Sequence, residues 1–176
     1  MTSLATFDQM PVDDAADLLI ACCGARRWVD GMLPRRPFGA LGALLATADD
    51  VWNALGPADW REAFARHPRL GESASAAPQD ERARAWSSGE QAEIRKGAGA
   101  DRAALAAANA AYEQRFGFIC IICATGLGAG EILTLTKERL ANDLEDELTI
   151  AAEEQRKITR LRLLKLFHEP DKAAAS

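Results

Sequence analysis

The sequence lacks the features of nucleic-acid-binding, membrane and exported proteins. Its 176 residues carry a net charge of -5, and no dense run of lysine and arginine is interleaved with aromatic side chains. No attraction to nucleic acid or to an anionic membrane surface is therefore expected. No apolar run approaches the roughly 18 residues that span a bilayer, and the first residues have no signal-peptide pattern. These absences predict a soluble, cytoplasmic protein.

The cysteines are few and poorly spaced for holding a metal ion. Cys22 and Cys23 are adjacent, and Cys120 and Cys123 form a CxxC pair. A structural zinc site draws on two separated chelating pairs, and adjacent cysteines are poorly placed to form one of them. The CxxC pair lies in the apolar run FICIICA, where cysteine is most often a small buried hydrophobe. We predict structural thiols and no metal, with metal or redox chemistry as the alternative.

The apolar residues recur with a helical period along almost the whole chain. Helices are predicted over residues 12–23, 25–32, 39–55, 57–67, 87–97, 101–116, 131–143 and 143–167. The polar stretch 68–86 is expected to form a long surface loop with a helical turn at its end. Residues 118–124 are the only strand-like run, and they have no partner strand. The fold class is therefore all-α, a single-domain orthogonal helical bundle over residues 1–170 with a disordered tail over 171–176.

One of the two histidines has a distinctive setting. His67 precedes Pro68 at the predicted end of a helix, whereas His168 lies in a frayed terminal segment. A histidine at such an end ordinarily interacts with the helix dipole and the last carbonyl groups. However, an unperturbed pKa of about 6.5 suits proton transfer near neutrality, and the proline holds the ring at a sharp exit from the helix. The local residues leave both interpretations open.

The segment SSGEQ, residues 87–91, has two compatible interpretations. Ser87 followed by Glu90 three residues later is a capping box, which predicts that a helix begins here. A helix N-terminus is also an anion-binding site, because its first N–H groups are unpaired and the dipole is positive there. Ser87 can thus cap the helix while Glu90 or Gln91 faces a ligand.

Arg162 lies on or beside the apolar stripe of the last predicted helix. The stripe runs through Leu144, Leu148, Ala151, Gln155, Ile158 and Arg162 at spacings of three and four. An arginine in such a place often extends to solvent along its aliphatic stem. The alternative is a planar guanidinium directed into a pocket, where it would hold a carboxylate or a urea oxygen.

Taken together, these motifs resemble a known family. Six segments have the order and spacing of the 2-oxo-4-hydroxy-4-carboxy-5-ureidoimidazoline (OHCU) decarboxylases: CCGARRWVDGMLPRRPF, HPRLGE, WSSGEQ, ANAAYEQRFGFICIICATG, ERLANDLEDEL and KITRLRL. The resemblance covers nearly the whole chain. It implies an all-α homodimer without cofactors that converts OHCU into (S)-allantoin and carbon dioxide in urate and purine catabolism. It also implies functional coupling to 5-hydroxyisourate hydrolase, which supplies the substrate.

The resemblance also implies site residues. His67 matches the catalytic histidine of the family, Glu90 its partner carboxylate, and Arg162 the arginine that faces the ligand. The substrate-contacting positions are matched by Pro68, Ser87, Ser88, Gly89, Glu90, Gln91, Cys120, Ile121, Ile122, Cys123 and Ala124. The chain departs from the family at FGFIC, where many members have FGFPF. Ile119 and Cys120 therefore change this wall of the pocket.

The absence of a cofactor motif agrees with the chemistry of OHCU, whose C=N bond beside the carboxylated carbon can accept the electron pair. The glycine-rich TGLGAG resembles a dinucleotide-binding turn, but no βαβ unit surrounds it, so it is assigned to an ordinary turn. Two other functions stay open. The chain could be a non-catalytic helical ligand-binding or regulatory module. In that case His67, Ser87, Glu90 and Arg162 are only helix caps and surface charges. It could also decarboxylate a related ureido-heterocycle.

Overall fold

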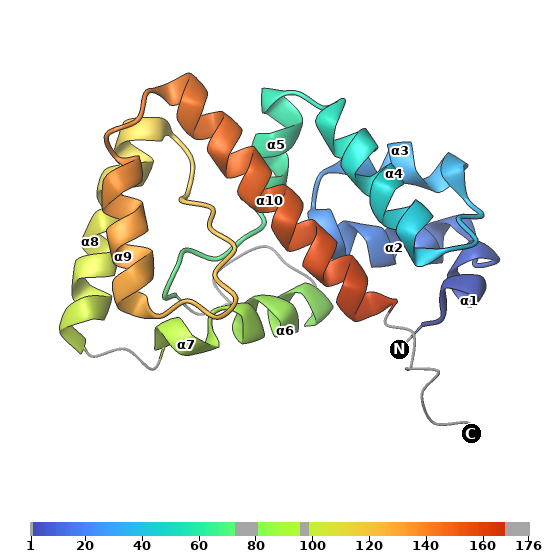
Figure 1. The fold of residues 1–176 in the computed structure, drawn as a ribbon, viewed down its shortest axis with the longest axis horizontal. Coiled ribbons are helices and arrows are strands. Elements are labelled where there is room, and N and C mark those ends of the chain that lie inside the picture. Colours follow the sequence, from blue (N-terminus) through green and yellow to red (C-terminus); the bar gives the residue numbers. More distant parts are fainter. Residues whose placement is uncertain (1, 73–80, 96–98, 168–176) are drawn as a thin grey trace.

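The computed structural model describes residues 2–72, 81–95 and 99–167, and these are helices joined by loops, with no strand (Figure 1). The helices are α1 (Leu4–Asp8), α2 (Val12–Cys23), α3 (Arg26–Met32), α4 (Leu41–Asn53), α5 (Pro57–Phe64), α6 (Glu81–Glu90), α7 (Ala92–Arg95), α8 (Gly99–Phe116), α9 (Ala129–Arg139) and α10 (Leu144–Leu166), with a 3-10 turn at Leu33–Arg35. The predicted all-α class is confirmed. None of the described helices is long and apolar enough to cross a membrane.

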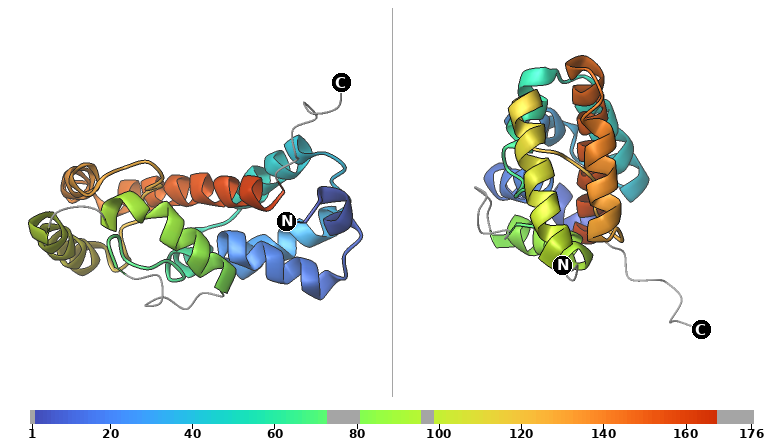
Figure 2. Two further views of the ribbon diagram at one scale, coloured as in Figure 1. Left: turned by 90° about the horizontal axis from the view of Figure 1, so that it is seen from below. Right: turned by 90° about the vertical axis from the view of Figure 1, so that its left-hand side faces the viewer.

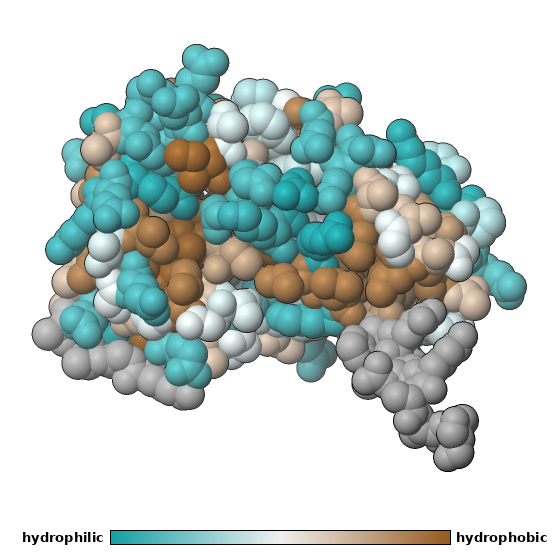
Figure 3. Space-filling view, in the orientation of Figure 1, coloured by the Kyte–Doolittle hydropathy of each residue, from teal (hydrophilic) through white to brown (hydrophobic). Residues whose placement is uncertain are grey.

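The longest helix, α10, joins the two ends of the molecule. It crosses the middle of the view in Figure 1, with α1 to α4 on one side, α8 and α9 on the other, and α5 beside its middle. It packs against α2, α4 and α5, while α8 packs along α9. Figure 2 shows α10 on one side of the molecule, with α2 and α6 on the other. In Figure 3, apolar side chains gather over α9 and along α10 between polar areas.

The amphipathic stripe predicted for α10 forms, except at its first residue. Asp143 caps the helix, because its side chain accepts a hydrogen bond of 2.9 Å from the Asp146 N–H. Leu148, Ala151, Gln155, Ile158 and Arg162 are buried, as the spacing of three and four requires. Leu144 is 49% exposed, since the helix starts beyond the edge of the core.

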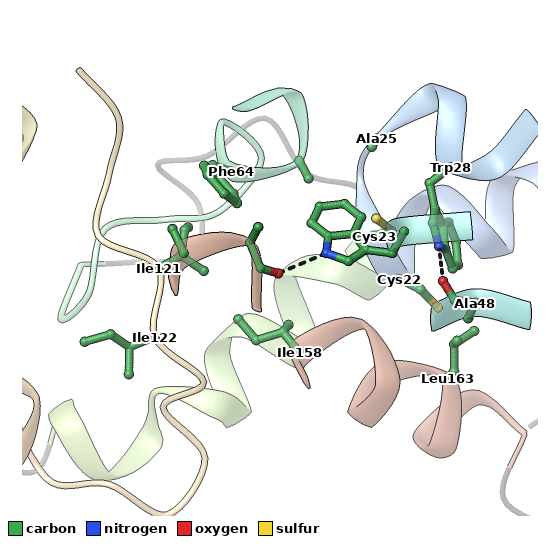
Figure 4. Packing of buried hydrophobic residues seen from close by; sticks show 14 of the residues in the cluster. Cys22, Cys23, Ala25, Trp28, Ala48, Phe64, Ile121, Ile122, Ile158 and Leu163 are labelled. Atoms are coloured by element: carbon green, nitrogen blue, oxygen red, sulfur yellow. Dashed lines mark hydrogen bonds between the residues drawn. The ribbon is translucent and has the colours of Figure 1, made fainter. Parts of the chain in front are cut away.

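Two tryptophans fix α4 between α3 and α10. The indole N–H of Trp28 donates to the Ala48 carbonyl at 3.1 Å, as Figure 4 shows. The indole of Trp52 reaches 100 residues along the chain to the Ala152 carbonyl at 3.0 Å. Both rings are buried, so each N–H needs such a partner. Cys22 and Cys23 lie buried in the same core, and neither forms a disulfide.

Several predicted boundaries need correction. The helix before Pro68 ends at Phe64 and continues only as turns, so His67 lies beyond it. The predicted loop 68–86 is helical from Glu81 onward, and its residues 73–80 lie outside the described ranges. The short helix α1 was not predicted. His168 and the tail 171–176 also lie outside the described ranges, so these predictions remain untested.

Candidate active site

A pocket lies where α6, α10, the exit from α5 and the extended segment before α9 meet. It is a hollow of about 410 Å³ that opens to solvent. It is lined by His67, Pro68, Leu70, Ser87, Glu90, Gln91, Cys120, Ile121, Ile122, Ala124, Thr125, Ile158 and Leu161. These residues come from four separate parts of the chain, so only the packing of the helices against α10 creates the pocket.

His67 lies at the sharp turn between α5 and the pocket. Its backbone N–H donates to the Phe64 carbonyl at 3.0 Å, which continues the helical path by one turn before the buried Pro68. Burial and the positive charge of Arg162 lower the pKa of His67 from 6.5 to about 3, and the Glu90 carboxylate opposes this only in part. The imidazole is therefore neutral at pH 7 and can accept a proton.

Glu90 and Arg162 form a buried ion pair with two parallel hydrogen bonds. The Arg162 Nε lies 3.1 Å from Glu90 Oε1, and its Nη2 lies 2.9 Å from Oε2. Lys165 adds a contact of 3.3 Å to the same carboxylate. Burial alone would raise the pKa of Glu90, but the hydrogen bonds and charge of Arg162 hold it below its ordinary value. Glu90 is thus an ionised carboxylate in a fixed orientation.

The guanidinium of Arg162 does not extend to solvent, since its side chain is only 3% exposed. Besides Glu90, it donates to the Ser87 hydroxyl at 3.0 Å and to the Ala21 carbonyl at 3.3 Å. It lines a smaller adjoining hollow of about 250 Å³, which His67 and Cys23 also line. Arg162 therefore binds Glu90 without lining the larger pocket, and His67 lines both hollows.

The predicted helix start at Ser87 is wrong. Ser87 lies inside α6, three residues before its end, and the Gln91 N–H donates to the Ser87 carbonyl at 3.2 Å. The helix begins earlier because the preceding ERARA is made of strong helix formers, so Ser87 has no first-turn N–H groups to cap. The capping box and the anion site at a helix N-terminus are therefore absent. Ser87 instead contacts Arg162, and the pocket meets the C-terminal turn of α6.

Most of the predicted substrate-contacting residues line the pocket together with His67: Pro68, Ser87, Glu90, Gln91, Cys120, Ile121, Ile122 and Ala124. Ser88, Gly89, Cys123 and Arg162 do not line it. Leu70, Thr125, Ile158 and Leu161 complete the wall and were not predicted as site residues. Ile158 belongs to the buried stripe of α10, but a stripe alone does not distinguish core from pocket. The roles of all these residues stay predictions.

Gln155 is a polar residue near His67 that was predicted only as part of the stripe. It is fully buried, and its amide nitrogen donates to the Thr159 hydroxyl at 3.2 Å. Its carbonyl oxygen has no hydrogen-bond partner in the described ranges, and the amide partly offsets the lowering of the His67 pKa. Gln155 is therefore placed to orient the imidazole from the side of α10.

Cys120 in the pocket wall and the nearby Cys123 are neutral thiols. Cys120 is buried with its sulfur 3.9 Å from the Thr136 hydroxyl, and burial raises the pKa of its thiol to about 11. Burial also raises the pKa of Cys123, which is partly exposed. Within the described ranges, no three His, Cys, Asp or Glu side chains are grouped so as to hold a metal ion. The thiols fit the predicted structural role at this wall.

The fold and the site define a class of small helical proteins with a polar pocket, in which a neutral histidine lies beside a carboxylate–guanidinium pair. The chain belongs to the OHCU decarboxylase family, whose model matches residues 8–164. It is 37% identical over 164 residues to the uric acid degradation bifunctional protein TTL of Arabidopsis thaliana, covering 93% of this chain and 50% of that protein. It is 41% identical over 70 residues to the 2-oxo-4-hydroxy-4-carboxy-5-ureidoimidazoline decarboxylase of Amia calva, covering 40% of each. The chain thus spans half or less of the curated relatives it matches.

Solved structures agree with this assignment. A crystal structure of OHCU decarboxylase in the presence of (S)-allantoin has a TM-score of 0.75 and 36% identity, covering 87% of this chain and 99% of that one. A crystal structure of (S)-allantoin synthase has a TM-score of 0.68 at 17% identity, covering 94% of this chain and 54% of that one. The second likeness shows the fold alone.

Proposed function

We propose that this protein decarboxylates OHCU to (S)-allantoin without a cofactor. The observation that carries the proposal is His67, which is held neutral beside the Glu90–Arg162 ion pair in the wall of a pocket that opens to solvent. The family membership supports it, as does the 36% identity to a structure described as OHCU decarboxylase in the presence of (S)-allantoin. A neutral imidazole is the proton acceptor that this reaction requires.

The electron balance of the reaction needs no external sink. The bond between C4 and its carboxylate breaks and releases carbon dioxide, and its electron pair forms a double bond between C4 and C5. The electrons of the C=N bond move to the ring nitrogen, which takes up a proton. The 4-hydroxyl then loses its proton as C4 becomes a carbonyl, and C5 gains a proton on one face. That last step sets the (S) configuration.

In this proposal His67 accepts the proton of the 4-hydroxyl. The carboxylate of Glu90 favours the imidazolium that forms, because it already raises the pKa of His67 against the effect of Arg162. Arg162 fixes the position of Glu90 through two hydrogen bonds. The predicted contact residues that line the pocket, with Ser87, Gln91 and Ile122 among them, then bind the heterocycle and its ureido group.

The test starts from urate, with urate oxidase and 5-hydroxyisourate hydrolase supplied, and follows allantoin by circular dichroism. We expect rapid appearance of the (S)-allantoin signal with the protein present, and a loss of at least about 100-fold in turnover for His67→Ala, the size typical of a general acid or base. The Tm of the variant serves as the control for folding. Slow formation of racemic allantoin with or without the protein would overturn the proposal. In that case related ureido-heterocycles, or a non-catalytic role, become the remaining hypotheses.

We further propose that the protein acts as a cytoplasmic homodimer and receives its substrate from 5-hydroxyisourate hydrolase. The family resemblance supports the dimer, as do the exposed apolar side chains Leu135, Leu144 and Ile150 on α9 and α10. The Arabidopsis relative is described as a bifunctional uric acid degradation protein, which supports coupling of two steps. Light scattering after size exclusion tests the dimer, and a monomer at micromolar concentration would contradict it.

A further inference from the structure

A buried cationic side chain, that of Arg139, binds one peptide group of the extended segment in the pocket wall. Arg139, at the end of α9, donates from Nη1 to the Ile121 carbonyl at 2.6 Å. Arg139 is itself fixed by Glu147, whose carboxylate lies 2.8 Å from its Nε and also accepts from Tyr112. Because these side chains are buried, the guanidinium can point in only one direction.

An anionic side chain, that of Glu154, holds the next peptide group along the chain. The Cys123 N–H donates to Glu154 Oε2 at 2.7 Å, a short bond to a carboxylate on α10. Glu154 also pairs with Lys157 at 2.6 Å, one helical turn further along. A cation and an anion therefore bind the backbone on either side of Ile122.

The peptide plane determines where the Ile122 groups point. Both peptide bonds of Ile122 are trans, so the N–H and C=O of each peptide group point in opposite directions. The Ile122 N–H thus points away from Arg139, and the Ile122 carbonyl away from Glu154. Neither group has a hydrogen-bond partner among the described residues, although Ile122 is buried and lines the pocket. Figure 4 shows the side chains of Ile121 and Ile122 on opposite sides of the segment, as in an extended chain.

The two charges also strengthen the groups that they leave free. A cation on the Ile121 carbonyl polarises the shared peptide group and makes the Ile122 N–H a better donor. A carboxylate on the Cys123 N–H makes the Ile122 carbonyl a better acceptor in the same way. In an extended chain the N–H and C=O of one residue lie on the same side, and in a β-ladder both can bond to the C=O and N–H of a single opposite residue.

We propose that Arg139 and Glu154 are positioning residues, which present the Ile122 N–H and carbonyl to a –NH–CO– unit of the ureide substrate. The inference rests on the proposed function and goes further, because it assigns to these two side chains the positioning of the backbone groups that bind the ureide unit. Neither residue lines the pocket, so each acts through the backbone of Ile122.

The test uses the full chain with substitutions at Glu154, whose side chain is 18% exposed. Glu154→Ala removes the acceptor of the Cys123 N–H, and Glu154→Gln retains a neutral one. Lys157→Ala is the matched control, since it breaks the ion pair but keeps the amide contact. The amide proton shifts of Ile122 and Cys123 report the backbone bond by NMR, and steady-state kinetics report its consequence.

We expect Glu154→Ala to lower kcat/KM for OHCU by about 10-fold or more, mostly through KM, because a binding group is misplaced. Glu154→Gln should recover part of this loss. Lys157→Ala should stay within about 2-fold, since exposed ion pairs contribute little. The amide proton of Cys123 should shift in Glu154→Ala and stay unchanged in the control Lys157→Ala.

The two proposals fail in different ways. An active wild type with unchanged kcat/KM in a folded Glu154→Ala variant overturns the positioning role and leaves the proposed function intact. A wild type without activity overturns the proposed function, and the positioning role falls with it. Arg139→Lys is a second variant, because lysine cannot contact Ile121 and Glu147 together in the geometry of a guanidinium. Unchanged KM in folded Arg139→Lys counts equally against the proposal.

Discussion

The protonation state of His67 depends on the charged side chains around its imidazole, which are those of Arg162, Glu90 and Lys165. Arg162 lowers the pKa of His67 and Glu90 raises it, but Glu90 is already bound to Arg162 and Lys165. Burial decides the balance in favour of the neutral ring. A substrate carboxylate bound here would shift the balance again toward the imidazolium, as a proton acceptor requires.

The depressed pKa of His67 predicts an acid-sensitive stability. In the unfolded chain the ring takes up a proton near pH 6.5, whereas in the folded protein it does so only near pH 3. The unfolded state thus binds more protons in this window, so stability is complete above pH 6.5 and falls as the pH falls below it. We expect the wild type to lose about 1–2 kcal/mol more than His67→Gln between pH 7 and pH 5.

Urea unfolding at both pH values measures this difference. Glu90 and Arg162, the charged groups that face His67, are present in both proteins, so their own contribution largely cancels. Equal losses in the two proteins would show that His67 titrates normally in the folded state.

At the scale of single elements, backbone geometry explains why glycine stands at the ends of two helices. Gly24 ends α2 in the left-handed region with φ of 90°, and Gly117 follows α8 with φ of 74°. Glycine adopts this conformation without a steric penalty, and it leads the chain out of the helix. Both helix ends could be predicted from the sequence, because a glycine directly after a periodic apolar run marks a helix C-terminus.

Gly24→Ala should therefore destabilise the protein by about 1–2 kcal/mol, the cost of a left-handed residue with a side chain. A Cβ at this position would also lie 3.1 Å from the Cδ of Arg66, which must move. Gly42→Ala in α4 is the matched control, because no atom lies within 4 Å of its added Cβ. The control should gain about 0.4–1 kcal/mol. A Gly24→Ala variant as stable as the wild type in urea would contradict the expectation.

At the scale of the whole molecule, the two ends of the chain close the core against each other. Phe7 of α1 packs edge-on against Phe167, just beyond α10, with ring centroids 4.9 Å apart, and it stacks with Phe38 at 6.3 Å. All three rings are largely buried. Residues 160 positions apart thus form one cluster, which holds α1 on the body.

Phe7→Ala should cost about 3–5 kcal/mol of unfolding free energy, the range for deleting a buried aromatic ring. Differential scanning calorimetry should show a Tm lower by about 10 °C in a chain of this size. Val12→Ala is the control, since Val12 is 58% exposed and its truncation should change stability by less than about 0.5 kcal/mol. A Tm equal to that of the wild type would show that α1 does not contribute to the core.

The sequence by itself determined the all-α class, most helices and the place of His67, because periodicity, proline and glycine act over a few residues. It was ambiguous at Ser87, since the same SxxE spacing occurs at a helix start and inside a helix, and the residues upstream decided the matter. It did not determine which polar groups meet. Arg162 and Glu90 are 72 residues apart, and Trp52 and Ala152 are 100 apart.

Only the tertiary structure brought these groups together. The guanidinium of Arg162 turns inward because α6 places a carboxylate opposite it, and a buried charge is stable only with such a partner. Arg139 reaches the Ile121 carbonyl for the same reason, with Glu147 beside it. Each pairing depends on how α10 lies against the rest of the molecule, which no local pattern fixes.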